Sequence, residues 1–73
     1  MDYKAFYAEV AEWINHVNQA AVKYGMHDEQ FWAWVSHSSG AISKKYQNNR
    51  LVINQMVMLI EWLEEVYEKH RMK

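Results

Sequence analysis

The sequence predicts an all-α fold, a bundle of three helices joined by short turns. The chain has no proline and only two glycines among its 73 residues, so little in it opposes helix formation. Apolar residues recur at helical spacing in three segments, which we place at residues 2–24, 28–46 and 49–71. The connections are short, which favours antiparallel neighbours, and the length leaves room for one core. We therefore expect a single helical domain over residues 1–73.

The first segment, residues 2–24, is amphipathic. At about 100° per residue one face collects its apolar side chains, namely Tyr3, Phe6, Tyr7, Val10, Trp13, Ile14, Val17, Ala20, Ala21 and Tyr24. Glu9, Glu12 and His16 fall on the opposite, polar face. Asp2 is expected to cap the first turn. Gly25 is expected to end the helix in a left-handed conformation, in a Schellman motif that includes Met26.

The second segment begins after Asp28, a natural N-cap residue. Its inward line is formed by residues at helical spacing, namely Phe31, Val35, Ser38, Ile42 and Tyr46. Trp32 and Trp34 flank that line about 160° apart at the helical angle per residue. Because one neighbour cannot cover both indoles, we expect a central helix with packing partners on two sides.

The small residues Ser38–Gly40 allow two interpretations of this segment. Serine and glycine are mediocre inside a helix, and glycine costs about 1 kcal/mol relative to alanine. We favour one continuous helix over 28–46. A break at Ser38–Gly40 is the alternative, and it would make a helix-turn-helix from residues 28–37 and 41–48.

The third segment, residues 49–71, follows Asn48 and Asn49, which are typical of a turn or cap. Its main apolar stripe contains Val52, Ile53, Met56, Leu59, Ile60, Leu63, Val66 and Tyr67. The opposite side carries Glu61, Glu64, Glu65 and Glu68, which we interpret as a solvated face. Cations at the C-terminal end suit the helix dipole there, and they are Lys69, His70, Arg71 and Lys73.

A second apolar line lies beside that stripe. It consists of Leu51, Met58 and Trp62, with Gln55 between them. Together the two lines make an apolar arc of about 220°, wider than a terminal helix needs inside its own bundle. Tryptophan and methionine are enriched in protein interfaces. These four residues are therefore the predicted protein-binding surface, with a homodimer as the simplest case; the competing interpretation is that Trp62 fills a gap against the second helix.

A basic and polar cluster supports an alternative, DNA-binding function. If the second segment breaks at Ser38–Gly40, the second half of a helix-turn-helix would present its polar side chains to DNA. The candidate nucleic-acid contacts are Ser43, Lys44, Lys45, Gln47 and Arg50. The net charge of −1 and the small number of cations argue against this interpretation.

Neither catalysis nor metal binding is predicted. Ser36, His37 and Ser38 are neighbours in sequence, and on a helix they point about 100° apart, so the histidine cannot easily act as a base for either serine. Glu12 and His16 are four residues apart, but a stable zinc site needs three or four converging ligands. The chain also has no cysteine. We predict no catalytic, cofactor-binding or metal-binding residue, and no small-molecule ligand is indicated.

The function class that remains is a small, non-enzymatic protein–protein interaction module, such as an inhibitor, adaptor or regulator. The longest apolar runs, residues 31–35 and 56–60, are far shorter than the ~18–20 residues of a membrane span. With no cysteine and an acidic, polar N-terminal stretch, we expect a soluble cytoplasmic protein. No motif of a known family is present; in general character, a tiny, cysteine-free and aromatic-rich helical chain resembles accessory proteins of bacteriophages, which implies no particular site residue.

Overall fold

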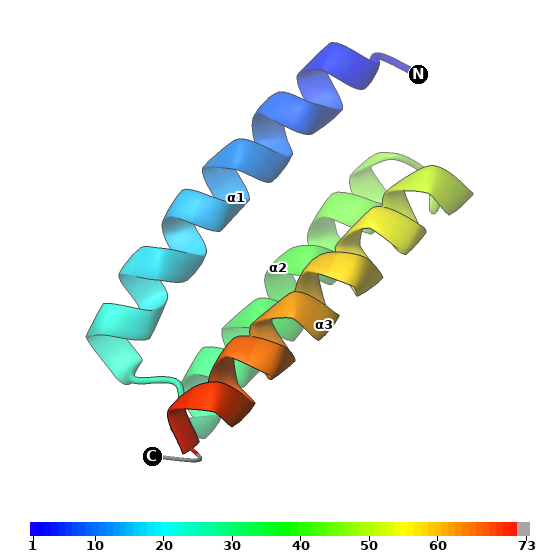
Figure 1. The fold of residues 1–73 in the computed structure, drawn as a ribbon. Helices are drawn as coiled ribbons and strands as arrows, with labels where there is room; N and C mark the ends of the chain where they lie inside the picture. The colour runs from blue at the N-terminus through cyan, green and yellow to red at the C-terminus, as the bar shows by residue number, and fades with distance from the viewer. Residues whose placement is uncertain (72–73) are drawn as a thin grey trace. The chain divides into compact units, whose positions relative to one another are not determined.

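The computed structural model describes residues 1–71, with side chains through residue 69, and it confirms the all-α fold class. Three helices follow one another along the chain (Figure 1): α1 Tyr3–Tyr24, α2 Glu29–Lys45 and α3 Arg50–Arg71. The part of the chain that is described contains no strand. Each helix begins or ends within one residue of its predicted position.

The three predicted caps explain where the helices begin. In each case the side-chain oxygen of the residue just before the helix accepts a hydrogen bond from a backbone N–H of the first turn. These bonds join Asp2 to Ala5 at 3.0 Å, Asp28 to Gln30 at 2.8 Å, and Asn49 to Leu51 at 2.9 Å. Each satisfies an N–H group that has no partner within its own helix.

The end of α1 differs from the predicted Schellman motif. Gly25 does have a positive φ of 84°, and its N–H donates to the carbonyl of Ala21 at 2.9 Å. Its ψ of 145°, however, is extended and lies outside the left-handed helical region that the motif needs. The Trp32 indole N–H donates to the Met26 carbonyl at 2.8 Å, which ties this turn to the start of α2.

A Schellman motif is instead found at the end of α2. The Asn48 N–H donates to the Ser43 carbonyl at 2.8 Å, and the Gln47 N–H donates to the Lys44 carbonyl at 3.0 Å. Gln47 and Asn48 have φ angles of 58° and 56°, the left-handed conformation that closes such a motif. Two successive left-handed residues reverse the chain before α3.

The helix α2 is continuous, as favoured from the sequence, and it has no break at Ser38–Gly40. The Ser38 hydroxyl donates to the Val35 carbonyl at 3.2 Å, and the Ser39 hydroxyl donates to the Ser36 carbonyl at 3.1 Å. Both hydroxyls thus find acceptors inside their own helix. This allows the serines to be tolerated there without a turn.

The chain forms two compact units. The first, Met1–Trp32, contains α1, the turn after it and the first turn of α2. The second begins at Ala33 and contains the rest of α2 and α3, which run in opposite directions on either side of the turn at residues 46–49 (Figure 1). A single domain over the whole chain stays a prediction.

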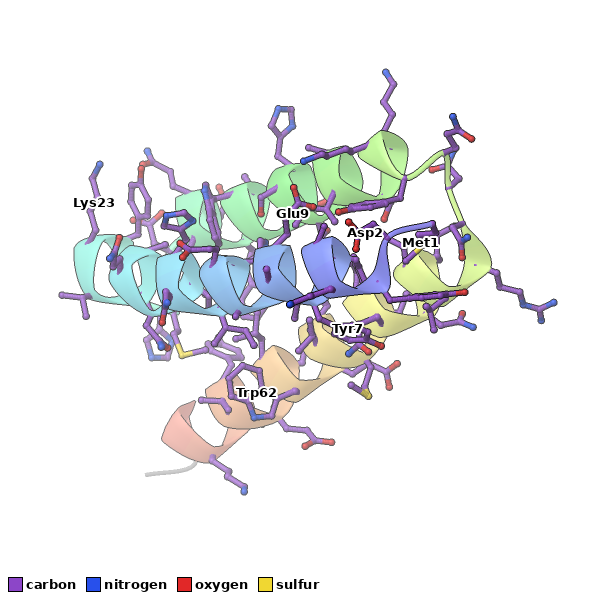
Figure 2. The ribbon with its side chains drawn as sticks, turned by 90° about the horizontal axis from the view of Figure 1, so that it is seen from above. Met1, Asp2, Tyr7, Glu9, Lys23 and Trp62 are labelled. Carbon is purple, nitrogen blue, oxygen red and sulfur yellow. The ribbon has the colours of Figure 1, made fainter. Side chains whose placement is uncertain are left out.

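The buried stripe of α1 is rotated from its predicted centre. Its buried members are Phe6, Val10, Trp13, Val17 and Ala20. Tyr3 and Tyr7, predicted on the apolar face, are exposed, whereas Glu9, predicted on the polar face, is half-buried. Figure 2 shows Tyr7 and Glu9 on opposite sides of α1. At the helical angle per residue, the stripe is centred near Phe6, so Glu9 lies at its edge and Tyr7 lies about 100° away.

On α2 the buried line also differs in one residue from the prediction. Phe31 and Val35 are buried as expected, but the third buried residue is Ser39, and Ser38 is half-buried. Both serines lie on the inner side of the helix, Ser38 about 40° and Ser39 about 60° from the direction midway between Phe31 and Val35, so the packing around α2, and not the helical angle alone, decides which of them is covered. The remaining members, Ile42 and Tyr46, are half-buried, and so are both tryptophans of this helix.

Candidate protein interface

Most of the predicted apolar stripe of α3 is buried or half-buried. Its buried residues are Val52, Met56, Leu59 and Leu63. Ile60, Val66 and Tyr67 are half-buried. Ile53, predicted in the stripe, is instead exposed, because it lies about 90° from the centre of the buried set.

The second apolar line of α3 is exposed. Leu51, Met58 and Trp62 keep 40%, 57% and 42% of their surface accessible, and Gln55 is half-buried. The spacing of four, three and four residues places all four on one side of the helix, about 100° from the centre of the buried stripe. Trp62, labelled on α3 in Figure 2, is therefore not enclosed, which argues against a mere gap-filling role.

Further apolar residues are exposed although the sequence did not predict their exposure. On α3, Ile53 and Val57 are exposed on the side away from Leu51. On or beside α1 the exposed apolar residues are Met1, Tyr3, Tyr7 and Val22. Val57 lies outside both predicted apolar lines of α3, so the sequence could have indicated it only if a wider apolar arc had been considered.

Charge is unevenly distributed along α3. Arg50 is the only charged residue in the first half of the helix, whereas Glu61, Glu64, Glu65, Glu68 and Lys69 follow in the second half among the side chains described, and all six are exposed. Lys44 and Lys45 lie in the last turn of α2, next to the turn that leads to Arg50. One end of the second unit is thus basic, and the middle of α3 changes to an acidic surface.

The candidate nucleic-acid contacts gather around the same turn. Lys44, Lys45, Gln47 and Arg50 are exposed, whereas Ser43 is half-buried. The Lys45 Nζ lies 5.9 Å from the centroid of the Tyr46 ring. Because α2 is continuous, the turn on which the helix-turn-helix interpretation depends is absent, and these residues stand at the end of one long helix and the start of the next.

The candidate catalytic and metal-binding residues lie on the surfaces of α1 and α2. Ser36 and His37 are exposed, as are Glu12 and His16. Among the side chains described, which run through residue 69, no group of three or more from histidine, cysteine, aspartate or glutamate is placed to hold a metal ion. Within the same residues, no helix has the length and apolar character needed to cross a membrane.

The exposed line of α3 is thus the most distinctive surface of the described chain. It combines three large apolar side chains on one side of a helix with a change of charge along that helix. No protein-family model, curated protein or solved structure matches this chain.

Proposed function

We propose that this chain is a non-enzymatic interaction module that binds another protein through Leu51, Gln55, Met58 and Trp62 of α3, as an inhibitor, adaptor or regulator. The observation that carries the proposal is the exposure of three large apolar side chains on one line. Fully burying one such side chain stabilises a structure by about 1.5–3 kcal/mol. A partner that covers this line therefore gains free energy that the free chain forgoes.

The dimensions of the line indicate how a partner would bind. From Leu51 to Trp62 it spans about 17 Å at 1.5 Å per residue, which is three turns. Anchors at this spacing are typical of a helix that lies against an apolar groove or a second amphipathic helix. Gln55, in the middle of the line, is half-buried and places a polar amide between the apolar side chains, which would help to fix the register of the contact.

The same proposal includes a cytoplasmic location and a bacteriophage origin. The absence of cysteine from all 73 residues fits a reducing compartment. The bacteriophage origin is supported only by the small size and the aromatic-rich composition. Neither is needed for the α3 surface to bind a protein.

Replacing Met58 by glutamate tests the binding surface. Met58 is the most exposed large residue of the line, so a charge there is expected to be tolerated by the fold and to disrupt an apolar contact. The tagged full chain and the Met58→Glu variant would be compared in capture of proteins from the native host and in sedimentation. We expect the variant to capture at least about ten-fold less protein, or to associate with itself at least about ten-fold more weakly.

Val22→Glu is the matched control for that experiment. Val22 is an apolar residue of α1 that is 89% exposed, so the same change of charge there removes little buried surface. Both variants should keep the circular dichroism of the original chain. If Met58→Glu binds as well as Val22→Glu in both assays, the α3 line is not the binding surface.

A further inference from the structure

We infer that the protein that covers the α3 line is a second copy of this chain, with the two α3 helices side by side and antiparallel. The inference rests on the proposed function, since it uses the same four residues as the contact. The order of charged and apolar residues along α3 is complementary to itself when one of the two helices is reversed.

The four residues of the line can pair with the same four residues of a second α3 that runs in the opposite direction. Leu51 and Trp62 stand at the two ends of the line, with Gln55 and Met58 between them. In an antiparallel pair with its centre between residues 56 and 57, Leu51 faces Trp62 of the second copy and Gln55 faces Met58. The same set of contacts occurs twice about a two-fold axis, so one patch serves both copies.

The charges select the antiparallel direction. Arg50 lies beside Leu51, and Glu61 and Glu65 lie on either side of Trp62 in the sequence, all three exposed. They occupy the same side of the apolar line, within about 110° of its centre at the helical angle per residue. Reversal therefore brings Arg50 of each copy toward Glu61 and Glu65 of the other. In a parallel pair the two-fold axis would carry these side chains to opposite sides of the contact, so no opposite charges would meet.

A charge-swap cycle in sedimentation equilibrium tests this arrangement with the full chain. Arg50→Glu and Glu65→Lys each place like charges opposite one another in the antiparallel pair. We expect each single variant to raise the dimer dissociation constant by about five-fold or more at low salt. The double variant Arg50→Glu/Glu65→Lys restores opposite charges, and its dissociation constant should return to within about two-fold of the original.

The charge-swap variants distinguish an antiparallel pair from a parallel pair and from a contact within one chain. Residues 50 and 65 are about 22 Å apart along the helix, so their side chains do not meet in the same copy. In a parallel pair these residues would lie on opposite sides of the contact, so neither the single variants nor the double variant would change the dissociation constant. Arg50 is the first residue of α3, where a glutamate suits the helix dipole, so Arg50→Glu is expected to fold.

Glu12→Lys is the control for the change in net charge, because Glu12 is an exposed residue of α1 and the change equals that of Glu65→Lys. It should leave the dissociation constant unchanged. A chain that remains monomeric from about 10 µM to 1 mM, or a dimer that the two single variants do not weaken, overturns the inference. A third outcome is that the chain is monomeric and captures a host protein that the Met58→Glu variant does not capture. That outcome would overturn the inference of a second copy and would still support the proposed function.

Discussion

Adding a side chain at Gly25 and at Gly40 is expected to have opposite effects on stability. Gly40 lies inside α2, and a Cβ added there meets no atom within 4 Å. A Cβ at Gly25 also finds open space, but the φ of 84° is one that other residues rarely adopt. The conformation of the backbone, rather than space, therefore decides the effect of each substitution.

Gly40→Ala is expected to raise the free energy of unfolding by up to about 1 kcal/mol, because alanine is the better residue inside a helix. Gly25→Ala is expected to lower it by about 1–2 kcal/mol, because alanine is strained at positive φ. Urea unfolding followed by circular dichroism measures both. Destabilisation by Gly40→Ala would indicate that α2 bends or breaks at this position in solution.

Capping residues could be predicted from the sequence, whereas the Schellman motif was assigned to the wrong helix. Asp2, Asp28 and Asn49 act through short side chains on neighbouring backbone groups, so local sequence suffices. A left-handed residue is usually glycine, and the prediction therefore chose Gly25. The motif at Gln47 needs a non-glycine residue in that conformation, for which the sequence contains no comparable signal.

At the scale of the element, α3 carries two methionines with opposite environments. Met56 is 2% exposed and Met58 is 57% exposed, although only two residues separate them. Residues that are two positions apart on a helix are separated by about 200° around its axis. One methionine therefore belongs to the buried stripe and the other to the exposed line. The same substitution at each position therefore tests the assigned face of the helix.

Met56→Glu is expected to unfold the chain, because it places an unpaired carboxylate in a buried site. A chain this small has a stability of only about 3–5 kcal/mol, which cannot absorb that cost. Met58→Glu should keep its helical circular dichroism and change the free energy of unfolding by about 0.5 kcal/mol or less. Cooperative unfolding of Met56→Glu at the original temperature would show that the buried stripe is wrongly placed.

The sequence predicted each helix and the centre of the α3 stripe, but not the edges of the stripes. Residues at the centre, such as Met56, are buried whatever the exact rotation of the helix. Residues near an edge, such as Tyr7, Glu9 and Ile53, change class when the helix turns by a few tens of degrees. That rotation depends on packing, which helical periodicity alone does not specify.

At the scale of the whole molecule, an all-α fold follows from periodicity, caps and the scarcity of helix breakers. The predicted surface of α3 could be identified because the helix carries more apolar residues than one stripe needs. Three of its four residues are exposed, and we propose that this surface binds protein. Tests of that claim are most direct when they observe the surface without altering it.

The most direct measurement is the NMR signal of the Met58 methyl group in a chain labelled with carbon-13 at its methionine methyls. The buried Met56 provides an internal reference in the same spectrum. We predict that the Met58 signal shifts as the protein concentration rises from about 10 µM to 1 mM, whereas the Met56 signal stays in place. A Met58 signal that keeps the position of a solvent-exposed methionine over that range, and also in the presence of any protein captured from the host, would show that the α3 line does not bind protein.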